Sequence, residues 1–325
     1  MPSPDWNHFD IPLFGWTITV HAYALCILVG IIVATVWTSR RLTARGGEPW
    51  IVLDIALWAV PLGIIGARAY HVLTHPSDYF YPGADPWEVI RIWNGGGAIF
   101  GALIGGAIGV YIGCRLTGIR FFSFADALAP GLLLAQAFGR LGNWFNHELF
   151  GQPTTLPWGL QIESDNPAFP VGLPDGTLFQ PTFLYEIIWN VIGVAVIVLL
   201  ERRFNLRWGK ALGVYLIWYG LGRWPLEAIR LDPSEIFLGV RTNIWAAWAA
   251  ILIGVVLILV QRRRHPGVEL SPYVPGREWA PPLDDEEYGD AEVDSEATDE
   301  IEAGEDAPVI ESRDTVATSS NGAQR

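Results

Sequence analysis

The chain has 325 residues, of which 51% are hydrophobic and 16 are tryptophan. This excess of apolar and aromatic residues is typical of an integral membrane protein rather than of a soluble domain. The net charge of −13 comes from residues 267–325, which hold 17 acidic and 3 basic residues, so no basic surface for nucleic acid is expected.

Seven apolar segments are long enough to cross a membrane, since a spanning helix needs about 20 mostly apolar residues. They are residues 16–38, 50–73, 97–114, 121–145, 182–200, 211–229 and 243–260. The sequence therefore predicts an all-α integral membrane fold with seven transmembrane helices. The segment before the first helix lacks the positive region of a signal peptide, so this helix is expected to remain in the mature protein.

The basic residues predict the orientation of these helices. Arginines and a lysine gather after the first, third, fifth and seventh segments, within residues 40–45, 115–120, 202–210 and 262–264. The intervening loops are poor in positive charge. Because basic loops remain in the cytoplasm, we expect the N-terminus outside and the C-terminus inside.

Two regions lie outside the predicted helices. Residues 146–180 are rich in Pro, Gly and Asp, and we expect a small ordered cap on the outer side, because structureless loops of this length are uncommon. Residues 266–325 are acidic and poor in large apolar residues, which predicts a disordered cytoplasmic tail. The expected organisation is a membrane domain over 1–265 followed by a tail over 266–325.

The two cysteines, Cys26 and Cys114, both lie in apolar runs without a CxxC spacing or a nearby histidine cluster. Small buried side chains are the simplest interpretation. Neither a disulfide framework nor a metal site is predicted.

Ionisable residues in spanning helices are costly, at about 2.5–3.5 kcal/mol for a central Arg or Asp, so their positions are informative. Minor polar groups lie near the predicted outer ends of the first, second, third and fifth helices. They are His21, Tyr23, Arg68, His71, Gly95, Gly96, Gly97, Tyr185 and Glu186. Taken singly, each is more simply explained by a structural role.

A denser cluster ends the fourth helix, in the run GRLGNWFNHELFG over residues 139–151. Arg140 and Asn143 are three apart and share a helix face. Asn146, His147 and Glu148 follow where the helix leaves the membrane. An ordinary polar helix end with a snorkelling arginine is the simple alternative. The density of amides beside a carboxylate favours a site.

The sixth helix carries a polar stripe of Tyr219, Arg223, Glu227 and Arg230, at steps of four, four and three. This spacing places them on one face. Two arginines and one glutamate leave the stripe with a positive charge, which suits an anionic ligand. The alternative is an Arg–Glu pair that only joins helices. Pro225 removes one backbone hydrogen bond and is expected to bend the helix toward a cavity.

With the predicted orientation, all these polar groups lie in the outer half of the membrane. We therefore expect one polar cavity that opens to the outer leaflet. Arginine binds phosphate through charge-assisted hydrogen bonds, and phospholipid head groups are the available phosphates at that depth. The residues alone leave open whether such a protein transfers or transports a lipid.

The run GRLGNWFNHELFG resembles the signature of prolipoprotein diacylglyceryl transferases, Gly-Arg-x-Gly-Asn-aromatic-x-Asn-x-Glu-x-x-Gly. Other segments similar to the family are HAYAL, GARAYHVL, QPTFLYE and YGLGRWPLEAIRLDP. The resemblance covers about residues 14–260. It implies seven helices with the N-terminus outside, in the bacterial plasma membrane.

The activity that the resemblance implies is transfer of diacylglycerol from phosphatidylglycerol to the lipobox cysteine of a prolipoprotein signal peptide. A thioether forms and glycerol phosphate leaves. No metal or soluble cofactor is implied, and no nucleic acid is a partner.

The resemblance also implies roles for individual residues. Arg140 would bind the phosphate and Arg223 would assist its departure, in a site lined by amides and tyrosines. The expected catalytic residues are Arg140, Glu148, Arg223 and Glu227. The expected substrate-binding residues are Arg140, Asn143, Asn146, Tyr23, His21, Arg68, Gly95, Gly96, Tyr219 and Arg230.

The sequence departs from the family at two positions. Phe100 and Gln180 stand where many members have histidines, of which the first is the proposed base. Glu148, His147 or His21 could accept the thiol proton instead. A free thiol has a pKa near 8.5, so a few per cent is thiolate at about pH 7, and a positive site would increase that fraction.

A transporter without chemistry would share the arginines and the cavity. It lacks sequence support, because no inverted repeat of the kind many transporters carry is visible. A mass shift on a lipobox peptide would separate the two classes, since only a transferase adds a diacylglyceryl group.

Overall fold

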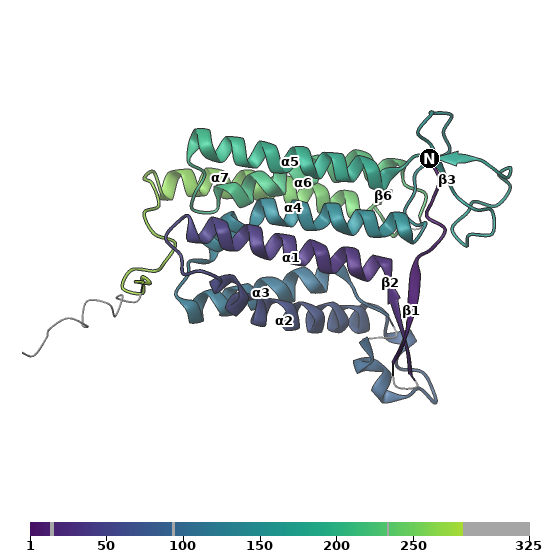
Figure 1. The fold of residues 1–325 in the computed structure, drawn as a ribbon, viewed down its shortest axis with the longest axis horizontal. Helices are drawn as coiled ribbons and strands as arrows, with labels where there is room; N and C mark the ends of the chain where they lie inside the picture. The colour runs from purple at the N-terminus through teal and green to yellow at the C-terminus, as the bar shows by residue number, and fades with distance from the viewer. Residues whose placement is uncertain (14–15, 93–94, 233, 282–325) are drawn as a thin grey trace, which may run out of the picture. The chain divides into compact units, whose positions relative to one another are not determined.

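Seven long α-helices of 19 to 25 residues dominate the computed structural model, which describes residues 1–281 apart from 14–15, 93–94 and 233. The helices are α1 (Ala22–Thr43), α2 (Ile51–Thr74), α3 (Ile99–Thr117), α4 (Phe121–Phe145), α5 (Thr182–Phe204), α6 (Lys210–Ile229) and α7 (Thr242–Arg264). They run side by side along one direction (Figure 1). Six of these helices, within the described residues, are long and apolar enough to cross a membrane, and α6 is not among them. The structure thus agrees with an integral membrane protein.

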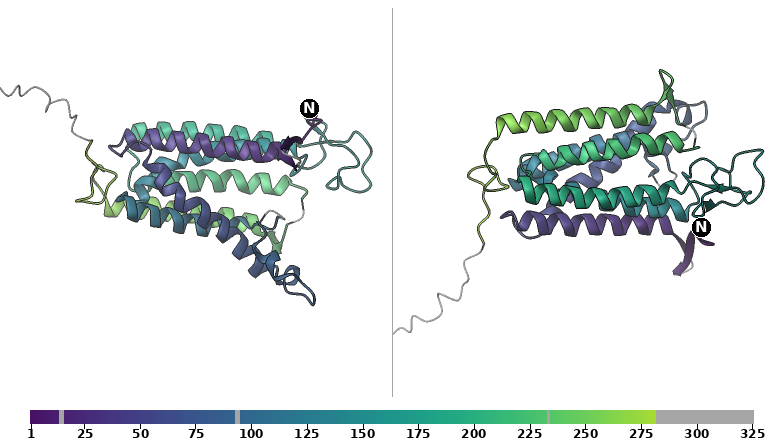
Figure 2. Two further views of the ribbon diagram at one scale, coloured as in Figure 1. Left: turned by 60° about the horizontal axis from the view of Figure 1, so that its bottom comes forward. Right: turned by 90° about the horizontal axis from the view of Figure 1, so that it is seen from above.

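Helix α4 lies at the centre of this arrangement, where it packs against α1, α3, α5 and α6. Of its most apolar 18-residue stretch, 56% is buried, against 11–28% in the other five candidate spans. The pairs α2–α3 and α6–α7 flank it (Figure 2). The helix that carries the signature motif is therefore the most enclosed one.

Helices α2 and α3 pack with their backbones in close approach. A Cβ atom added to Gly101 would lie 2.1 Å from the carbonyl oxygen of Gly66, and one added to Gly105 would lie 2.1 Å from that of Leu62. Such distances exclude any side chain, so the glycines spaced by four residues on α3 set this contact.

The first predicted helix is wrong at its start. Residues 16–21 form strand β2 (Trp16–His21), which pairs antiparallel with β1 (His8–Leu13). The run WTITVH alternates apolar and polar residues and contains four β-branched ones, which favours a strand over a helix turn. Helix α3 also begins and ends later than predicted, at Ile99 and Thr117, while α4 matches its predicted bounds.

Three helices extend by about one turn or more beyond their predicted C-terminal ends. They are α1, α5 and α7, which end at Thr43, Phe204 and Arg264. Each added turn contains at least two arginines. Positive charge near a helix C-terminus is favourable, so these basic residues continue the helix instead of forming the loop.

Residues 146–180 form the ordered cap that the sequence predicts. The short strands β3 (Leu160–Gln161) and β4 (Leu178–Phe179) pair in it. Their side chains join a small apolar cluster of Phe150, Leu160, Ile162, Phe179 and Phe183. We call this end of the helices the cap end. The connection from α2 to α3 also lies there and contains the 3-10 helices η1 (Pro76–Asp78) and η2 (Pro86–Ile90). The connection from α6 to α7 contains the short strands β5 (Ile236–Phe237) and β6 (Val240–Arg241).

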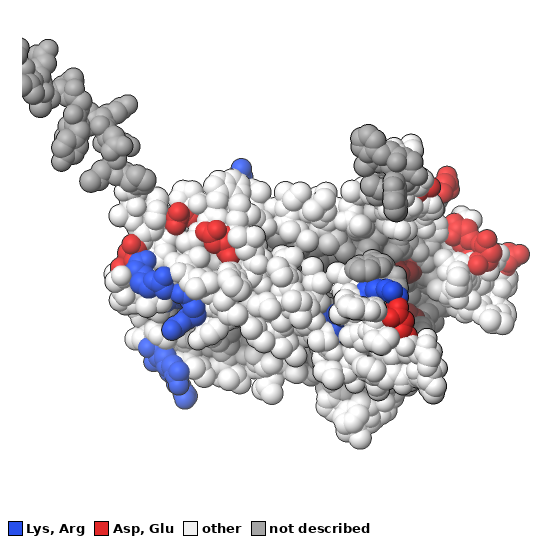
Figure 3. Space-filling model, turned by 90° about the horizontal axis from the view of Figure 1, so that it is seen from below, with Lys and Arg blue, Asp and Glu red and all other residues white. Residues whose placement is uncertain are grey.

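The opposite end is the basic end, where the predicted basic loops meet. Nε of Arg41 donates to the carbonyl of Ala127 at the start of α4 over 3.0 Å, and Nζ of Lys210 approaches the carbonyl of His265 at 3.3 Å. In the face that Figure 3 shows, basic side chains gather toward this end beside some acidic ones, and acidic side chains gather at the cap end beside a few basic ones. The charge asymmetry of the sequence is thus an asymmetry between the two helix ends.

The segment after α7 corrects the expectation that disorder begins at residue 266. Tyr273 is only 2% exposed and packs with Leu42 and Ile55. Its hydroxyl accepts a hydrogen bond from the backbone N–H of Glu48 over 2.9 Å. Arg277 donates to the last carbonyls of α3. The chain divides into units Met1–Ala280 and Pro281–Arg325, and residues 282–325 lie outside the described residues.

Candidate active site

One carboxylate joins three helices at the cap end. Nε of Arg140 on α4 lies 2.6 Å from Oε2 of Glu186 on α5. Nη1 of Arg223 on α6 lies 3.9 Å from Oε1 of the same carboxylate. The two arginines that the sequence predicts to share a ligand therefore approach the same anionic group.

Glu227 lies at the centre of a second set of contacts and is fully buried. Its Oε2 is 2.7 Å from Nη2 of Arg223 and 3.6 Å from Nη1 of Arg230. Its Oε1 is 3.2 Å from Nε of Arg241 and accepts a hydrogen bond from Asn243 over 2.9 Å. Burying an ionised carboxylate is tolerable only with such partners, and Glu227 has four.

Arg230 faces Asp232 through two hydrogen bonds, of 2.7 and 2.8 Å. Burial works to lower the pKa of the Arg230 guanidinium, but the hydrogen bonds and charge of Asp232 outweigh it, so the pKa lies above its ordinary value. Arg241 donates to the backbone carbonyls of Glu227 and Arg230. Arg230 is therefore held as part of the network rather than free for a ligand.

The end of α4 forms a short chain of polar contacts. Nη1 of Arg140 donates to Asn143 over 3.1 Å, and Asn143 donates to Oε1 of Glu148 over 2.7 Å. Asn146 adds a second donor to Oε1 at 3.3 Å. The four residues that the motif predicted to act together are thus connected by hydrogen bonds.

Backbone pairing after α4 fixes the ends of α5 and α6 beside it. Gly151 donates to the carbonyl of Gln180 over 2.9 Å, and Gln152 donates to the carbonyl of Ile229 over 2.9 Å. A Cβ atom on Gly151 would lie 2.8 Å from Cβ of Gln180. The glycine that ends the motif is therefore needed for the close approach that positions Glu186 and Arg230.

We name this network the Glu227 cluster, of Arg140, Glu148, Glu186, Arg223, Glu227, Arg230, Asp232 and Arg241. It contains four arginines and four acidic residues, so the expectation of an uncompensated arginine is wrong. That expectation counted one helix, whereas the balancing carboxylates come from other segments. Within the described residues, no group of three or more His, Cys, Asp or Glu side chains is placed to hold a metal ion.

Two guanidinium groups of the cluster retain donors for a ligand. Nη1 of Arg223 is buried and has no hydrogen-bond partner within the described part of the chain, since Glu186 is 3.9 Å away. Arg140 contacts Glu186 through Nε and Asn143 through Nη1, and none of the described contacts involves its Nη2. A buried donor without a partner is costly, so Nη1 of Arg223 favours an additional acceptor.

Tyr23 lies next to this network, while the described contacts of His21 and Tyr219 are with other aromatic rings. A Cβ on Gly142 would be 2.6 Å from the Tyr23 ring, and the charges of Glu148 and Arg140 act on the Tyr23 hydroxyl. Tyr219 stacks on Tyr215, at 6.2 Å between ring centroids. His21 lies beside His8 on the hairpin, at 5.8 Å. Ligand contacts of His21 and Tyr219 stay predictions.

Arg68 holds a separate part of the cap end. Its guanidinium donates to the backbone carbonyls of Val89, Gly95 and Gly96 at 2.6–3.1 Å and also to that of Glu88. It also lies over the Tyr79 ring, 4.7 Å from the centroid. These contacts give Arg68 a structural role in ordering the segment before α3, so its contact with substrate stays a prediction, as do those of Gly95 and Gly96.

The candidate bases differ in what their atoms already bind. Nδ1 of His147 is 2.9 Å from Glu163 and Nε2 is 2.8 Å from the carbonyl of Pro4, so both nitrogens already have partners outside the Arg140–Arg223 network. Phe100, at the family histidine position, packs against Tyr70 with 6.3 Å between ring centroids. The geometry therefore disfavours His147 as the base.

Sequence reasoning missed four members of the surroundings of Glu227 and Arg140. Glu186 was noted only as a minor polar residue, and Asp232, Arg241 and Asn243 were not noted as site residues. Glu186, Arg241 and Asn243 lie on other segments from the residues they contact, and spacing along one helix cannot reveal such pairs. Asp232 follows its partner Arg230 by two residues, just beyond the end of α6. The available signal for Glu186 was its place in the run QPTFLYE.

Comparison with known proteins agrees with this geometry. The family model described as "Prolipoprotein diacylglyceryl transferase" matches residues 12–260. A phosphatidylglycerol–prolipoprotein diacylglyceryl transferase of Leifsonia xyli subsp. xyli is 63% identical over 305 residues, which cover 92% of this chain and 89% of the relative. Proteins of the same name are 47% identical in Paenarthrobacter aurescens, over 81% of this chain and 84% of the relative, and 44% identical in Streptomyces coelicolor (transferase 2), over 90% of each.

Proposed function

The chain belongs to the prolipoprotein diacylglyceryl transferase family, and we propose that its Glu227 cluster binds the phosphate of phosphatidylglycerol and promotes the departure of that phosphate. The enzyme transfers the diacylglyceryl group of phosphatidylglycerol to a prolipoprotein, the first step of lipoprotein maturation. The observation that carries the site assignment is the Glu186 carboxylate between Arg140 and Arg223. A singly charged group with two oxygens fits between these guanidiniums, and a phosphodiester presents the same features.

The phosphate-binding atoms of this proposal are Nη1 of Arg223 and Nη2 of Arg140. The first is buried without a hydrogen-bond partner among the described residues, and the second is unassigned by the described contacts. A phosphate oxygen at each would complete both guanidiniums by charge-assisted hydrogen bonds. The carboxylates of Glu186 and Glu227 hold the two arginines in place, so no large rearrangement is needed during reaction.

The chemical step forms one bond and breaks one bond. The sulfur of the prolipoprotein cysteine attacks the glycerol carbon that bears the phosphate, the carbon–oxygen bond breaks, and the electron pair leaves with glycerol phosphate. The thiol proton leaves with this phosphate or passes to water, because a phosphate monoester has a second pKa near 6. The two arginines stabilise the charge that develops on the leaving phosphate.

Glu148 is assigned an anchoring role by the same contacts. Its Oε1 already accepts hydrogen bonds from the side-chain amides of Asn143 and Asn146. Its charge in turn fixes Asn143, which accepts from Arg140. In this proposal Glu148 positions the phosphate-binding arginine, and Tyr23 packs on the same helix end.

The proposal also includes the orientation of the helices in the membrane. We infer seven spans in the bacterial plasma membrane, with α6 as the seventh, the cap end outside and the basic end in the cytoplasm. Helix α6 is less apolar because it carries Arg223 and Glu227, and the central helix α4 packs against it. The second substrate is a signal peptide with a lipobox cysteine, which enters from the outer leaflet.

The direct test is a reconstituted assay with labelled phosphatidylglycerol and a lipobox peptide. The peptide should gain the mass of one diacylglyceryl group, and release of glycerol phosphate should match it in amount. A peptide in which serine replaces the cysteine is the control. Uptake or movement of lipid without a mass change would indicate a transporter and reject the proposal.

A further inference from the structure

A second arginine cluster lies at the basic end, where α1, α5 and the α5–α6 loop meet. Glu201 near the end of α5 is 2.5 Å from Nη2 of Arg41 and 2.6 Å from Nη2 of Arg45. Its Oε1, already bonded to Arg45, is 3.8 Å from Nη1 of Arg207. Three guanidiniums therefore share one carboxylate; we name these residues the Glu201 cluster.

Two other acidic groups nearby are directed elsewhere. Asp126 is fully buried and accepts the backbone N–H groups of Gly209 and Leu212 over 2.7 and 2.9 Å, so it caps the start of α6. Glu269 approaches Arg120 at 3.4 Å and hydrogen-bonds the hydroxyl of Ser123. Neither carboxylate is bonded to Arg207 in the described contacts.

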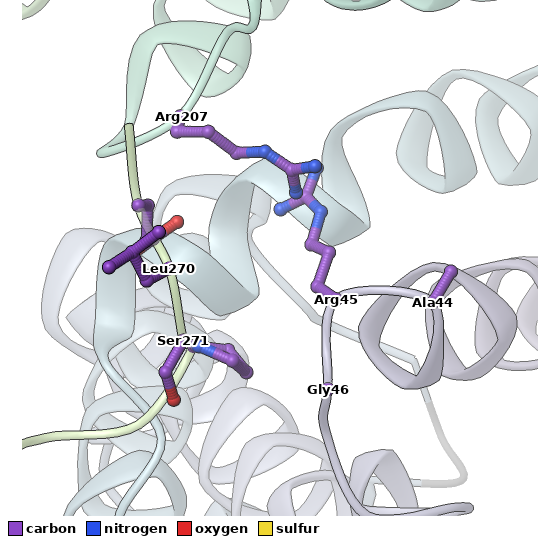
Figure 4. Close-up of a pocket in the computed structure, with 8 residues that line it drawn as sticks. Ala44, Arg45, Gly46, Arg207, Leu270 and Ser271 are labelled. Carbon is purple, nitrogen blue, oxygen red and sulfur yellow. The ribbon is translucent and has the colours of Figure 1, made fainter. Parts of the chain in front are cut away.

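Arg207 is the least satisfied member of the cluster. Its Nε is buried without a hydrogen-bond partner, and the described contacts assign no hydrogen bond to its other nitrogens. Figure 4 shows its guanidinium directed toward that of Arg45. Burial and then the positive charge of Arg45 lower the pKa of Arg207 more than the charges of nearby carboxylates raise it, so an anion placed there would favour its charged form.

These side chains open into a cavity of about 370 Å³. It is lined by Ala44, Arg45, Gly46, Arg207, Glu269, Leu270, Ser271 and Pro272. The volume lies in the range of small-ligand sites, which is roughly 300–1,000 Å³, and far exceeds the roughly 30 Å³ of one water molecule. The segment after α7 forms one wall, so the site exists only when that segment is packed.

We propose that this cavity binds a phosphate group at the basic end, separate from the phosphate site of the Glu227 cluster. Arg207 and Arg45 supply the planar donors that match phosphate oxygens. Ser271 also lines the cavity, but its hydroxyl accepts a hydrogen bond from the backbone N–H of Tyr273 over 3.2 Å. Glu269 opposes binding by its charge but is compensated by Arg120. The phosphate is either free in the cytoplasm or the head group of an inner-leaflet lipid.

The test uses full-length protein in nanodiscs of zwitterionic phosphatidylcholine. Inorganic phosphate binding is measured by equilibrium dialysis, and a parallel set of nanodiscs contains phosphatidic acid, with the unfolding temperature as readout. Arg207→Gln is compared with Arg202→Gln, since Arg202 is exposed on the same helix end and outside the cavity. Transferase activity serves as the folding control, because neither residue belongs to the Glu227 cluster.

We expect Arg207→Gln to weaken phosphate binding by at least about tenfold relative to Arg202→Gln, with near-normal activity in both. A response to inorganic phosphate identifies a free anion, and a response only to phosphatidic acid identifies a lipid head group. The proposal is overturned if neither probe affects the wild type, or if the two variants respond alike. If Arg207→Gln does not insert, Arg207→Lys replaces it: weaker binding than wild type supports the site, and equal binding rejects it.

Discussion

The two arginine clusters lie at opposite ends of the same helices, and α5 contributes a glutamate to each. Glu186 near the start of α5 and Glu201 near its end are about 22 Å apart along the helix axis. In the Glu227 cluster, four acidic groups balance four arginines. In the Glu201 cluster, one carboxylate serves three arginines, and Arg207 is left without a hydrogen bond in the described residues.

The difference separates two ways of using arginine. A balanced and buried network fixes the directions of its guanidiniums, so Arg140 and Arg223 can each present one unused donor to a reacting phosphate without moving. An unbalanced cluster attracts an anion but does not orient it toward chemistry. We therefore assign catalysis to the cap end and only binding to the basic end.

The largest expected effect is on stability, from neutralising the central carboxylate of each cluster. Glu227→Gln leaves Arg223, Arg230 and Arg241 buried without their shared counter-charge, which should cost about 3–5 kcal/mol. Glu201→Gln should cost less, because the Glu201 side chain is 13% exposed and water can solvate its partners. Thermal unfolding of both variants in detergent shows which substitution lowers the stability more. Equal losses would contradict the contrast between the clusters.

The next effect concerns activity. Arg140→Lys and Arg223→Lys keep the charge but lose the planar fork, so each should lose about 2–4 kcal/mol of transition-state stabilisation, which is roughly 30- to 1000-fold in rate. Arg202→Lys, at the exposed basic end, is the matched control and should retain activity. The rates are compared on well-inserted protein. Normal turnover in both cap-end variants would reject the phosphate-binding role of these arginines.

A smaller effect separates the packed segment after α7 from the residues beyond it. Truncation after His265 removes Tyr273 and should destabilise the protein by at least about 1.5–3 kcal/mol, the value of one large buried side chain. Truncation after Ala280 should leave both stability and activity near normal. Tyr273→Ala should reproduce most of the first loss. If both truncated proteins unfold at the wild-type temperature, the packing of this segment contributes nothing.

The smallest expected effect is that of Phe100→Ala. Phe100 packs against Tyr70 and has no contact with the Glu227 cluster in the described structure. Its removal should therefore reduce activity less than either Arg→Lys variant, after correction for protein level. A loss as large as that of Arg223→Lys would place Phe100 in the catalytic machinery.

The helices and the residue pairs within one helix could be predicted from the sequence, because they depend only on neighbouring residues: the length of an apolar segment and the spacing along a helix. They predicted α4 at its observed bounds and grouped Arg140 with Asn143, and Arg223 with Glu227. The start of α1 was wrong because an apolar strand and an apolar helix turn have the same hydropathy. Only the alternation within WTITVH distinguishes them.

Most of the charge balance could not be predicted, because it depends on pairs between distant segments. Glu186 on α5 reaches Arg140 on α4, and Arg241 in β6 reaches Glu227 on α6. Asp232 is different, because it follows Arg230 by two residues and only lies outside the helical spacing. Distance along the chain also hid the packed segment around Tyr273, whose partners Leu42 and Ile55 lie more than 200 residues earlier. Composition classed this segment with the acidic residues that follow it.

The central claim is that Arg140 and Arg223 contact the same phosphate, and a double-mutant cycle on kcat/KM tests it most directly. The two Arg→Lys variants and their combination are assayed with labelled phosphatidylglycerol. Because both arginines also contact Glu186 in the free enzyme, their substitutions can be coupled without any phosphate. Unfolding temperatures of the same variants measure that coupling separately. If both residues bind one phosphate, the double variant should lose clearly less activity than the product of the two single losses. Losses that multiply fully, with each variant stably inserted, would show that the two arginines act independently and would contradict the account.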